Sequence, residues 1–224
     1  MKSIITHIWI VLYKDFLLEV RSKEIFISVL IFTILEVLIF NFAFNPTTEI
    51  IYIVVPAILW VSITFSGVII INRTMQLEMQ NGMMKALLIS SMSRESIFWG
   101  KSFATTIYLI LIELILLILL TIFYDLNLPL ISVFLISLPC IFGFSLVGTV
   151  FSVISVNSRA QEILLPVLFL PVVIPIILCA VSITSNLLLN LPIFDSINWL
   201  NLVIIFDLIY FIIGPFCFYA ITSD

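Results

Sequence analysis

Long apolar runs separated by short polar stretches dominate this sequence. Six of these runs are about long enough to cross the hydrocarbon of a bilayer as helices, at about 1.5 Å per residue over about 30 Å. They cover Ile25–Phe44, Ile50–Ile71, Phe103–Phe123, Leu130–Val156, Ile163–Ile183 and Leu200–Ile221. The pattern predicts an all-α integral membrane protein with about six transmembrane helices, in one transmembrane domain over residues 1–224.

A different pattern precedes the first run. Apolar residues recur there at three- and four-residue spacing, and the charged residues stand opposite them. The apolar positions are Ile4, Ile5, Ile8, Trp9, Leu12 and Phe16, and the charged ones are Lys14, Asp15 and Glu19. This arrangement predicts a helix over residues 1–23 that lies in the membrane interface. An extension of the first span is the alternative interpretation.

The basic residues orient the six predicted spans. With an even number of spans, all nine lysines and arginines fall in the N-terminal segment and in the second and fourth connections, on one side of the membrane. The other three connections contain Glu49, Asp125 and Asp195 but no basic residue. The positive-inside rule therefore places both termini and the 72–102 connection in the cytoplasm, or in the matrix if the membrane is the mitochondrial inner membrane.

Composition excludes several classes of protein. The chain is 63% hydrophobic and 10% charged, with a mean hydropathy of +1.34, far from the balance of a soluble domain. Its scattered basic residues form no nucleic-acid-binding stripe. One histidine, His7, and three distant cysteines provide no metal-binding cluster. We therefore expect no bound metal or cofactor, and any catalytic domain must come from a partner.

The 72–102 connection is the largest on the basic side. Its mixed pattern predicts two short interfacial helices with a turn at Ser90–Ser93, where Ser93 caps the second helix. We interpret it as a docking surface. Gly100-Lys101-Ser102 resembles the end of a phosphate-binding loop, but Glu95 stands where that motif requires glycine. The connection is therefore not expected to bind ATP.

Three acids stand inside predicted spans: Glu36, Glu113 and Asp207. An ionised carboxylate at that depth costs several kcal/mol, so each acid is expected to be protonated, hydrogen-bonded or exposed to a wet cavity. One interpretation is a proton relay or polar substrate path, and the other is hydrogen bonding between helices. Small residues in the fourth span, including Gly148 and Thr149, predict the close approach of another helix.

Three segments carry a resemblance to a known family. NRTMQLEMQNGMMKALLISSMSRESIFWGKS, VNSRAQEILLPVLFLPVVIPIILCAV and KDFLLEVRSKE followed by IFNFAF resemble CcmB, the membrane subunit of system I cytochrome c maturation. The resemblance extends over nearly the whole chain. It implies a six-helix permease of the ABC-2 type in an inner membrane, with the ATPase CcmA and with CcmC, CcmD and the haem chaperone CcmE as partners.

The resemblance also implies roles. ATP would be hydrolysed by CcmA, haem would be handled by the complex, and this subunit would be non-catalytic, coupling hydrolysis to the release of haem-loaded CcmE. The residues matching an ATPase-coupling loop are Glu78, Gly82, Arg94, Gly100 and Lys101, and those matching a second signature are Asn157, Arg159, Glu162 and Pro166. The chain departs from the family pattern at Ser90–Ser93, where a proline is expected, and at Gln80 and Asn81, where acids are common.

Two other functions fit a small polytopic protein. In a proton-coupled secondary transporter, the three intramembrane acids would carry protons and no ATPase would exist. Its two halves should show repeat symmetry, whereas three prolines crowd the fifth span and the second has only Pro56. A membrane scaffold for assembly factors, with no transport, is the other alternative.

Overall fold

The structure is a computed structural model that describes residues 2–43, 48–80, 82–125, 129–156 and 161–222. Their regular secondary structure is entirely helical. The helices are α1 (Lys2–Ser22), α2 (Glu24–Ala43), α3 (Thr48–Gln80), α4 (Met83–Ile89), α5 (Arg94–Tyr124), α6 (Leu130–Val156), α7 (Gln161–Leu188) and α8 (Ile193–Thr222). Six of them, α2, α3, α5, α6, α7 and α8, are long and apolar enough to span a membrane, which confirms the prediction of six spans.

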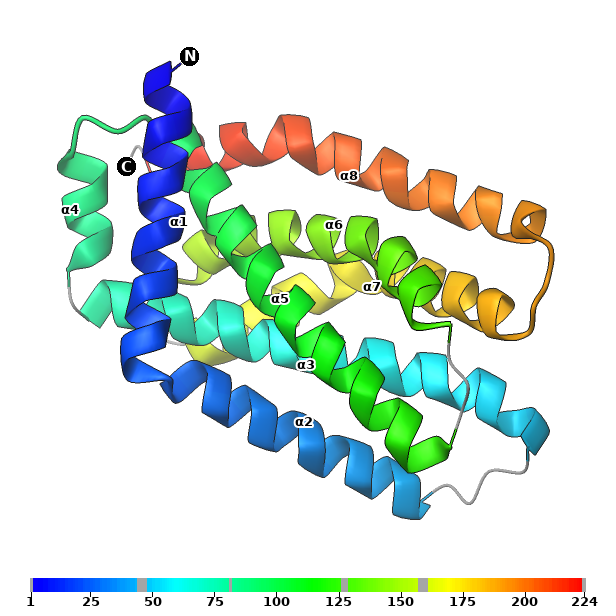
Figure 1. Cartoon of the computed structure of the whole chain (residues 1–224). Helices are drawn as coiled ribbons and strands as arrows, with labels where there is room; N and C mark the ends of the chain where they lie inside the picture. The colour runs from blue at the N-terminus through cyan, green and yellow to red at the C-terminus, as the bar shows by residue number, and fades with distance from the viewer. Residues whose placement is uncertain (1, 44–47, 81, 126–128, 157–160, 223–224) are drawn as a thin grey trace.

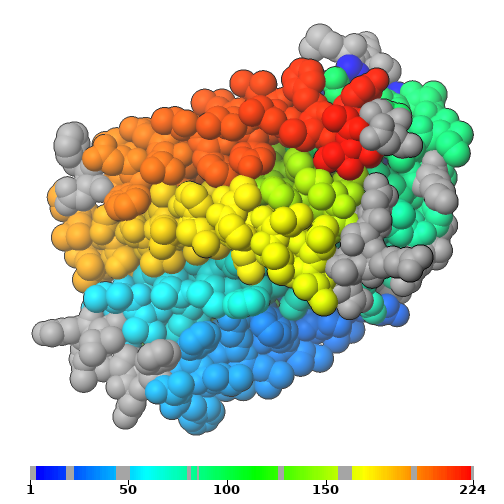
Figure 2. Space-filling model, turned by 180° about the vertical axis from the view of Figure 1, so that it is seen from behind, coloured from blue at the N-terminus to red at the C-terminus, as the bar shows by residue number. Residues whose placement is uncertain are grey.

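The six long helices form a bundle of alternating direction, and α1 crosses it (Figure 1). On the rear face α8, α7, α3 and α2 lie side by side in that order (Figure 2). Helix α5 runs across the front of the bundle in Figure 1 and contacts α1, α2, α3, α6 and α8. We call the end of the bundle where α5 begins and α3, α6 and α8 end the basic end.

Helix α1 is separate from the first span, as predicted. Lys23 lies between α1 and α2 with a left-handed φ of 55°, which ends one helix before the next begins. Apolar residues of α1, such as Trp9 and Ile5, point away from the protein, while Val11 is fully buried. The charged face carrying Lys14 and Asp15 packs on the bundle instead of facing solvent. Charged side chains that face the protein interior must be paired with other charged or polar groups there.

The 72–102 connection differs from the prediction. It is not a loop with two interfacial helices, because residues up to Gln80 continue α3 and residues from Arg94 belong to α5. Only α4 is a separate short helix. Its inward-facing residue Met84 is buried in an apolar cluster at the basic end. The cap is confirmed: Ser93 Oγ accepts a hydrogen bond from the Ser96 amide at 3.3 Å.

Polar contacts between spans are made mainly by hydroxyl groups. Between α5 and α6, Ser102 Oγ donates to Thr149 Oγ1 at 3.1 Å, and the hydroxyls of Thr106 and Ser145 are 2.6 Å apart. A Cβ on Gly148 would collide with Ile71 of α3. The small residues of α6 therefore permit close helix packing, as their spacing predicts.

Gly100 is required where α1 crosses α5. A Cβ at this position would lie 2.6 Å from Val11 Cβ and 3.0 Å from the Ile8 carbonyl oxygen, neither of which can turn aside. We predict that Gly100→Ala lowers the free energy of unfolding by about 1–3 kcal/mol through overpacking. Thermal unfolding of the purified protein in detergent measures the change.

Gly82 offers a matched control. It has a left-handed φ of 65°, and nothing lies within 4 Å of a Cβ built there. Gly82→Asn keeps the conformation accessible and should be nearly neutral. Equal losses of stability in Gly100→Ala and Gly82→Asn would contradict the close α1–α5 contact.

Candidate functional site

A network of ion pairs joins three helices at the basic end. Glu78, in the last turns of α3, accepts hydrogen bonds from Lys14 Nζ of α1 through Oε1 and from Lys101 Nζ of α5 through Oε2. Lys14 Nζ also lies 2.9 Å from Asp15 Oδ1. We call these four residues the Glu78 network. One carboxylate thus connects α1 and α5 to the end of α3.

The network is buried and electrically balanced. Glu78 is 2% exposed and Lys101 is 7% exposed, while the side chain of Lys14 keeps 25% of its surface in contact with solvent. Two lysines face two carboxylates, so the formal charges cancel. Removing charges from water costs several kcal/mol per ion, and only well-placed partners offset that cost. The arrangement therefore stabilises α1 in one position and penalises positions that separate the charges.

Burial and neighbouring charges shift the pKa values of Lys14 and Asp15 on α1. Burial by itself lowers the pKa of Lys14, but the carboxylates of Asp15 and Glu78 outweigh burial and raise it above its ordinary value. Burial raises the pKa of Asp15, against the attraction of Lys101 and Lys14. Lys14 therefore holds its proton more firmly in the folded protein than in the unfolded chain.

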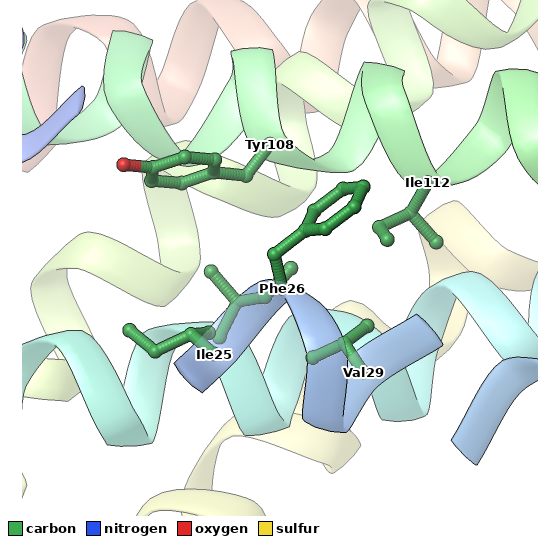
Figure 3. A pocket seen from close by; sticks show the side chains of 6 residues that line it. Ile25, Phe26, Val29, Tyr108 and Ile112 are labelled. Carbon is green, nitrogen blue, oxygen red and sulfur yellow. The ribbon is translucent and has the colours of Figure 1, made fainter. Parts of the chain in front are cut away.

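Tyr108 of α5 completes the contact with α1. Its hydroxyl donates a hydrogen bond to the Asp15 carbonyl oxygen at 2.9 Å. Its ring stands beside Phe26 and other apolar residues from the start of α2, and its hydroxyl points away from them (Figure 3). Tyr108 therefore separates an apolar niche under α2 from the polar side of the crossing.

A small cavity lies on that polar side. Its volume is about 20 Å³, and its walls include Asp15, Lys101, Thr74, Thr105 and Thr149. Such a volume accommodates about one water molecule, which needs two to four polar partners of the kind these residues provide. It is too small for a haem or a nucleotide, so the Glu78 network is a structural link and not a substrate pocket.

The residues matched to the coupling loop lie in different settings. Glu78 and Lys101 are buried in the network, and Gly100 is buried beneath α1. These three do not lie on the surface, contrary to the expectation that they contact an ATPase. Gly82 is exposed before α4, and the Arg94 guanidinium stands 4.8 Å from the ring centre of Tyr219 at the end of α8.

Helix α4 provides the exposed surface of this region. Met84 is buried and Leu87 and Leu88 pack against the same apolar cluster, so the helix is fixed to the bundle. Its last residue, Ile89, is 86% exposed. Ile89 is therefore the large apolar residue that α4 exposes most at the basic end.

The second signature falls mostly outside the described residues. Asn157 and Arg159 lie between the described ranges, and the side chain of Glu162 is also outside the description. Pro166 is half-buried in the first turns of α7. The structure therefore does not test a role for this signature.

The three intramembrane acids lie between different pairs of helices. Glu36 of α2 faces Ser62 of α3. Glu113 of α5 is fully buried and accepts a hydrogen bond from Ser137 Oγ of α6. Asp207 of α8 lies against Gly143 of α6, where a Cβ would collide with its carboxylate oxygen. Glu113 and Asp207 thus both pack on α6, on either side of Cys140, whereas Glu36 lies apart from them between α2 and α3.

The sequence analysis missed three members of the crossing: Lys14, Asp15 and Tyr108 form contacts that it did not assign to a site. Lys14 and Asp15 were assigned to the polar face of an interfacial helix, where solvent is the usual neighbour. Two adjacent opposite charges in the middle of α1 were the available signal. Their partners, Glu78 and Lys101, are distant in sequence, so spacing alone does not pair them.

Comparison with known proteins identifies one family. The model of the family described as CcmB protein matches residues 6–222, which is nearly the whole chain. Compared with curated proteins, the chain has no significant match.

Among the described residues, no group of three His, Cys, Asp or Glu side chains is placed to hold a metal ion.

We predict that Glu78→Gln destabilises the protein by about 3–5 kcal/mol, because it removes the carboxylate bonded to the buried Lys101 and leaves Lys14 with Asp15 alone. Glu95→Gln is the matched control, since Glu95 is exposed in the first turn of α5. Thermal or denaturant unfolding in detergent compares the two variants. If both unfold like the native protein, Glu78 does not hold the crossing together.

Stability should also fall at alkaline pH through Lys14. The pKa of Lys14 is raised in the folded protein, so its contribution is complete below the unfolded pKa of about 10.4 and is lost as pH rises through the folded value. The difference in unfolding temperature between the native protein and Lys14→Met should therefore be largest at pH 8 and shrink toward pH 11. Parallel curves for the two proteins would exclude this contribution.

Proposed function

The chain belongs to the CcmB family, the membrane permease component of the haem export machinery of cytochrome c maturation, and we propose that it couples a separate ATPase, CcmA, to movement of its own helices. The Glu78 network is the observation that supports this proposal. It joins α3, the helix that precedes α4, to α1 and α5. In this proposal the subunit itself is non-catalytic, and ATP is hydrolysed on the partner.

Helix α4 is the proposed contact with CcmA. Its inner face is fixed to the bundle through Met84, and the exposed Ile89 is available for contact with a partner. Arg94 and Gly82 flank it and are the remaining candidates from the predicted coupling loop. The basic end would then face the cytoplasm or the mitochondrial matrix, where the positive-inside rule places it.

The network gives this contact a route into the bundle. Force on α4 passes to the end of α3 through the short turn at Gly82, and Glu78 lies within one turn of that end. Movement of Glu78 alone would leave the buried Lys101 without its bonded carboxylate and Lys14 with Asp15 alone. Helices α1 and α5 are therefore expected to follow α3 as one body.

The chain contributes no nucleotide site in this proposal. Gly100-Lys101-Ser102 lies inside α5, and Lys101 Nζ is bonded to Glu78. A phosphate-binding loop needs that ammonium group free to reach the phosphates. Haem handling and release of haem-loaded CcmE are proposed as properties of the whole complex with CcmC and CcmD.

The two alternatives receive less support. A proton-coupled transporter would require its acids to line one path, whereas Glu36, between α2 and α3, lies apart from Glu113 and Asp207 on α6. A scaffold that does not move would not need α4 to be exposed, nor to be linked to the spans through the buried charges of the Glu78 network. Both alternatives predict that changes in α4 leave ATP turnover unaltered.

The test is Ile89→Asp in the assembled complex. A charge at an exposed apolar anchor should weaken the contact by at least about 1.4 kcal/mol, so the amount of CcmA that co-purifies should fall about tenfold. Ser91→Asp, two residues away and also exposed, is the matched control and should retain CcmA. ATP turnover of each purified complex, and cytochrome c formed in cells, should follow CcmA binding. Normal binding and turnover in Ile89→Asp would reject α4 as the contact.

A further inference from the structure

A cavity much larger than the one beside the Glu78 network lies at the opposite end of the bundle. It has a volume of about 350 Å³ and opens among α6, α7 and α8, at the end where α7 finishes and α8 begins (Figure 1). Its walls are aliphatic: Ile136 comes from α6, Ile183 and Leu187 from α7, and Leu200 from α8. This volume falls at the lower end of the range that holds small ligands.

Two amides stand at the polar part of this cavity. Asn190 follows the end of α7 in a left-handed conformation with φ 53°, and Asn201 is in the second or third turn of α8. Both are exposed, and within the described parts of the chain neither carboxamide has a hydrogen-bond partner. Ser196 differs, because it accepts from Asn186 Nδ2 at 3.3 Å. The two carboxamides therefore offer free N–H donors to a ligand.

The charge of the cavity limits the chemistry of that ligand. None of the described residues that line it is charged, and no lysine or arginine occurs anywhere in the sequence after Arg159. A haem, with two propionate groups, would lose hydration here without gaining a cation. The ligand must be apolar over most of its length and must present uncharged hydrogen-bond acceptors near the amides.

The position of the cavity in the membrane identifies the source of such a ligand. Trp199 lies next to Leu200 on α8 and is 39% exposed, and tryptophan at the end of a span marks the level of the lipid headgroups. The aliphatic walls extend from that level toward the middle of the spans through Ile183 and Ile136. An acyl chain with ester carbonyls at its polar end has this distribution of apolar and acceptor groups.

We propose that this cavity binds one acyl chain of a membrane phospholipid. The ester carbonyls accept hydrogen bonds from Asn190 and Asn201, and the hydrocarbon fills the space between α7 and α8. The bound chain supplies contacts that the side chains do not provide at this junction, so it stabilises the packing of α8. This role is separate from coupling to an ATPase at the basic end.

Native mass spectrometry of the full-length protein tests the proposal, with palmitoyl-oleoyl phosphatidylethanolamine added to lipid-depleted protein in mild detergent. The native protein should retain one tightly bound phospholipid. Leu187→Trp fills the cavity and should lose that lipid. Leu208→Trp is the matched control, because Leu208 is 55% exposed on the outer side of α8, and it should bind like the native protein.

A second variant keeps the cavity open. Asn190→Ala/Asn201→Ala removes both donors and should weaken the tight site by about tenfold, as expected for the loss of two hydrogen bonds. This variant carries the test if circular dichroism shows that Leu187→Trp does not fold. Unchanged binding in the folded cavity variants would overturn the proposal. A tightly bound species whose mass is not that of a phospholipid, such as a quinone or haem, would also overturn it.

Discussion

The burial of Glu78 between two lysines is the constraint on which the arrangement of the basic end depends. A carboxylate in that position is tolerated only while Lys14 and Lys101 remain beside it, and the lysines depend equally on the carboxylate. The charged face of α1 is therefore directed inward, and its apolar face is left for lipid. The close crossing at Gly100 and the hydrogen bond from Tyr108 to α1 are compatible with that one orientation.

The remainder of the bundle is held by a different set of forces. Inside the spans, hydroxyl pairs such as Ser102–Thr149 and close contacts at glycine replace ion pairs. Hydrophobic burial contributes little between helices surrounded by lipid, so such packing and polar contacts determine how the spans associate. The molecule thus combines a basic end fixed by charge with a membrane region fixed by packing.

Much of this fold can be predicted from the sequence, because long apolar runs have few alternatives in a membrane. The six spans, the separate N-terminal helix and the Ser93 cap are all visible as local patterns. The extent of α3 and α5 past the long apolar runs was not visible, since Glu78 and Lys101 are polar and were assigned to a loop. Their pairing with Lys14 depends on which face of α1 meets the bundle, and periodicity does not determine that choice.

If the Glu78 network holds α1 and α5 together as one body, the distance between these two helices should be fixed. Spin labels on exposed positions of the two helices, at Tyr13→Cys and Glu95→Cys, report their separation by pulsed electron paramagnetic resonance, after replacement of the three native cysteines. We predict a single narrow distance distribution for the labelled protein in nanodiscs. The distribution should broaden when the substitution Glu78→Gln is added. A distribution that stays equally narrow in Glu78→Gln, or that is already broad with Glu78 present, would contradict this prediction.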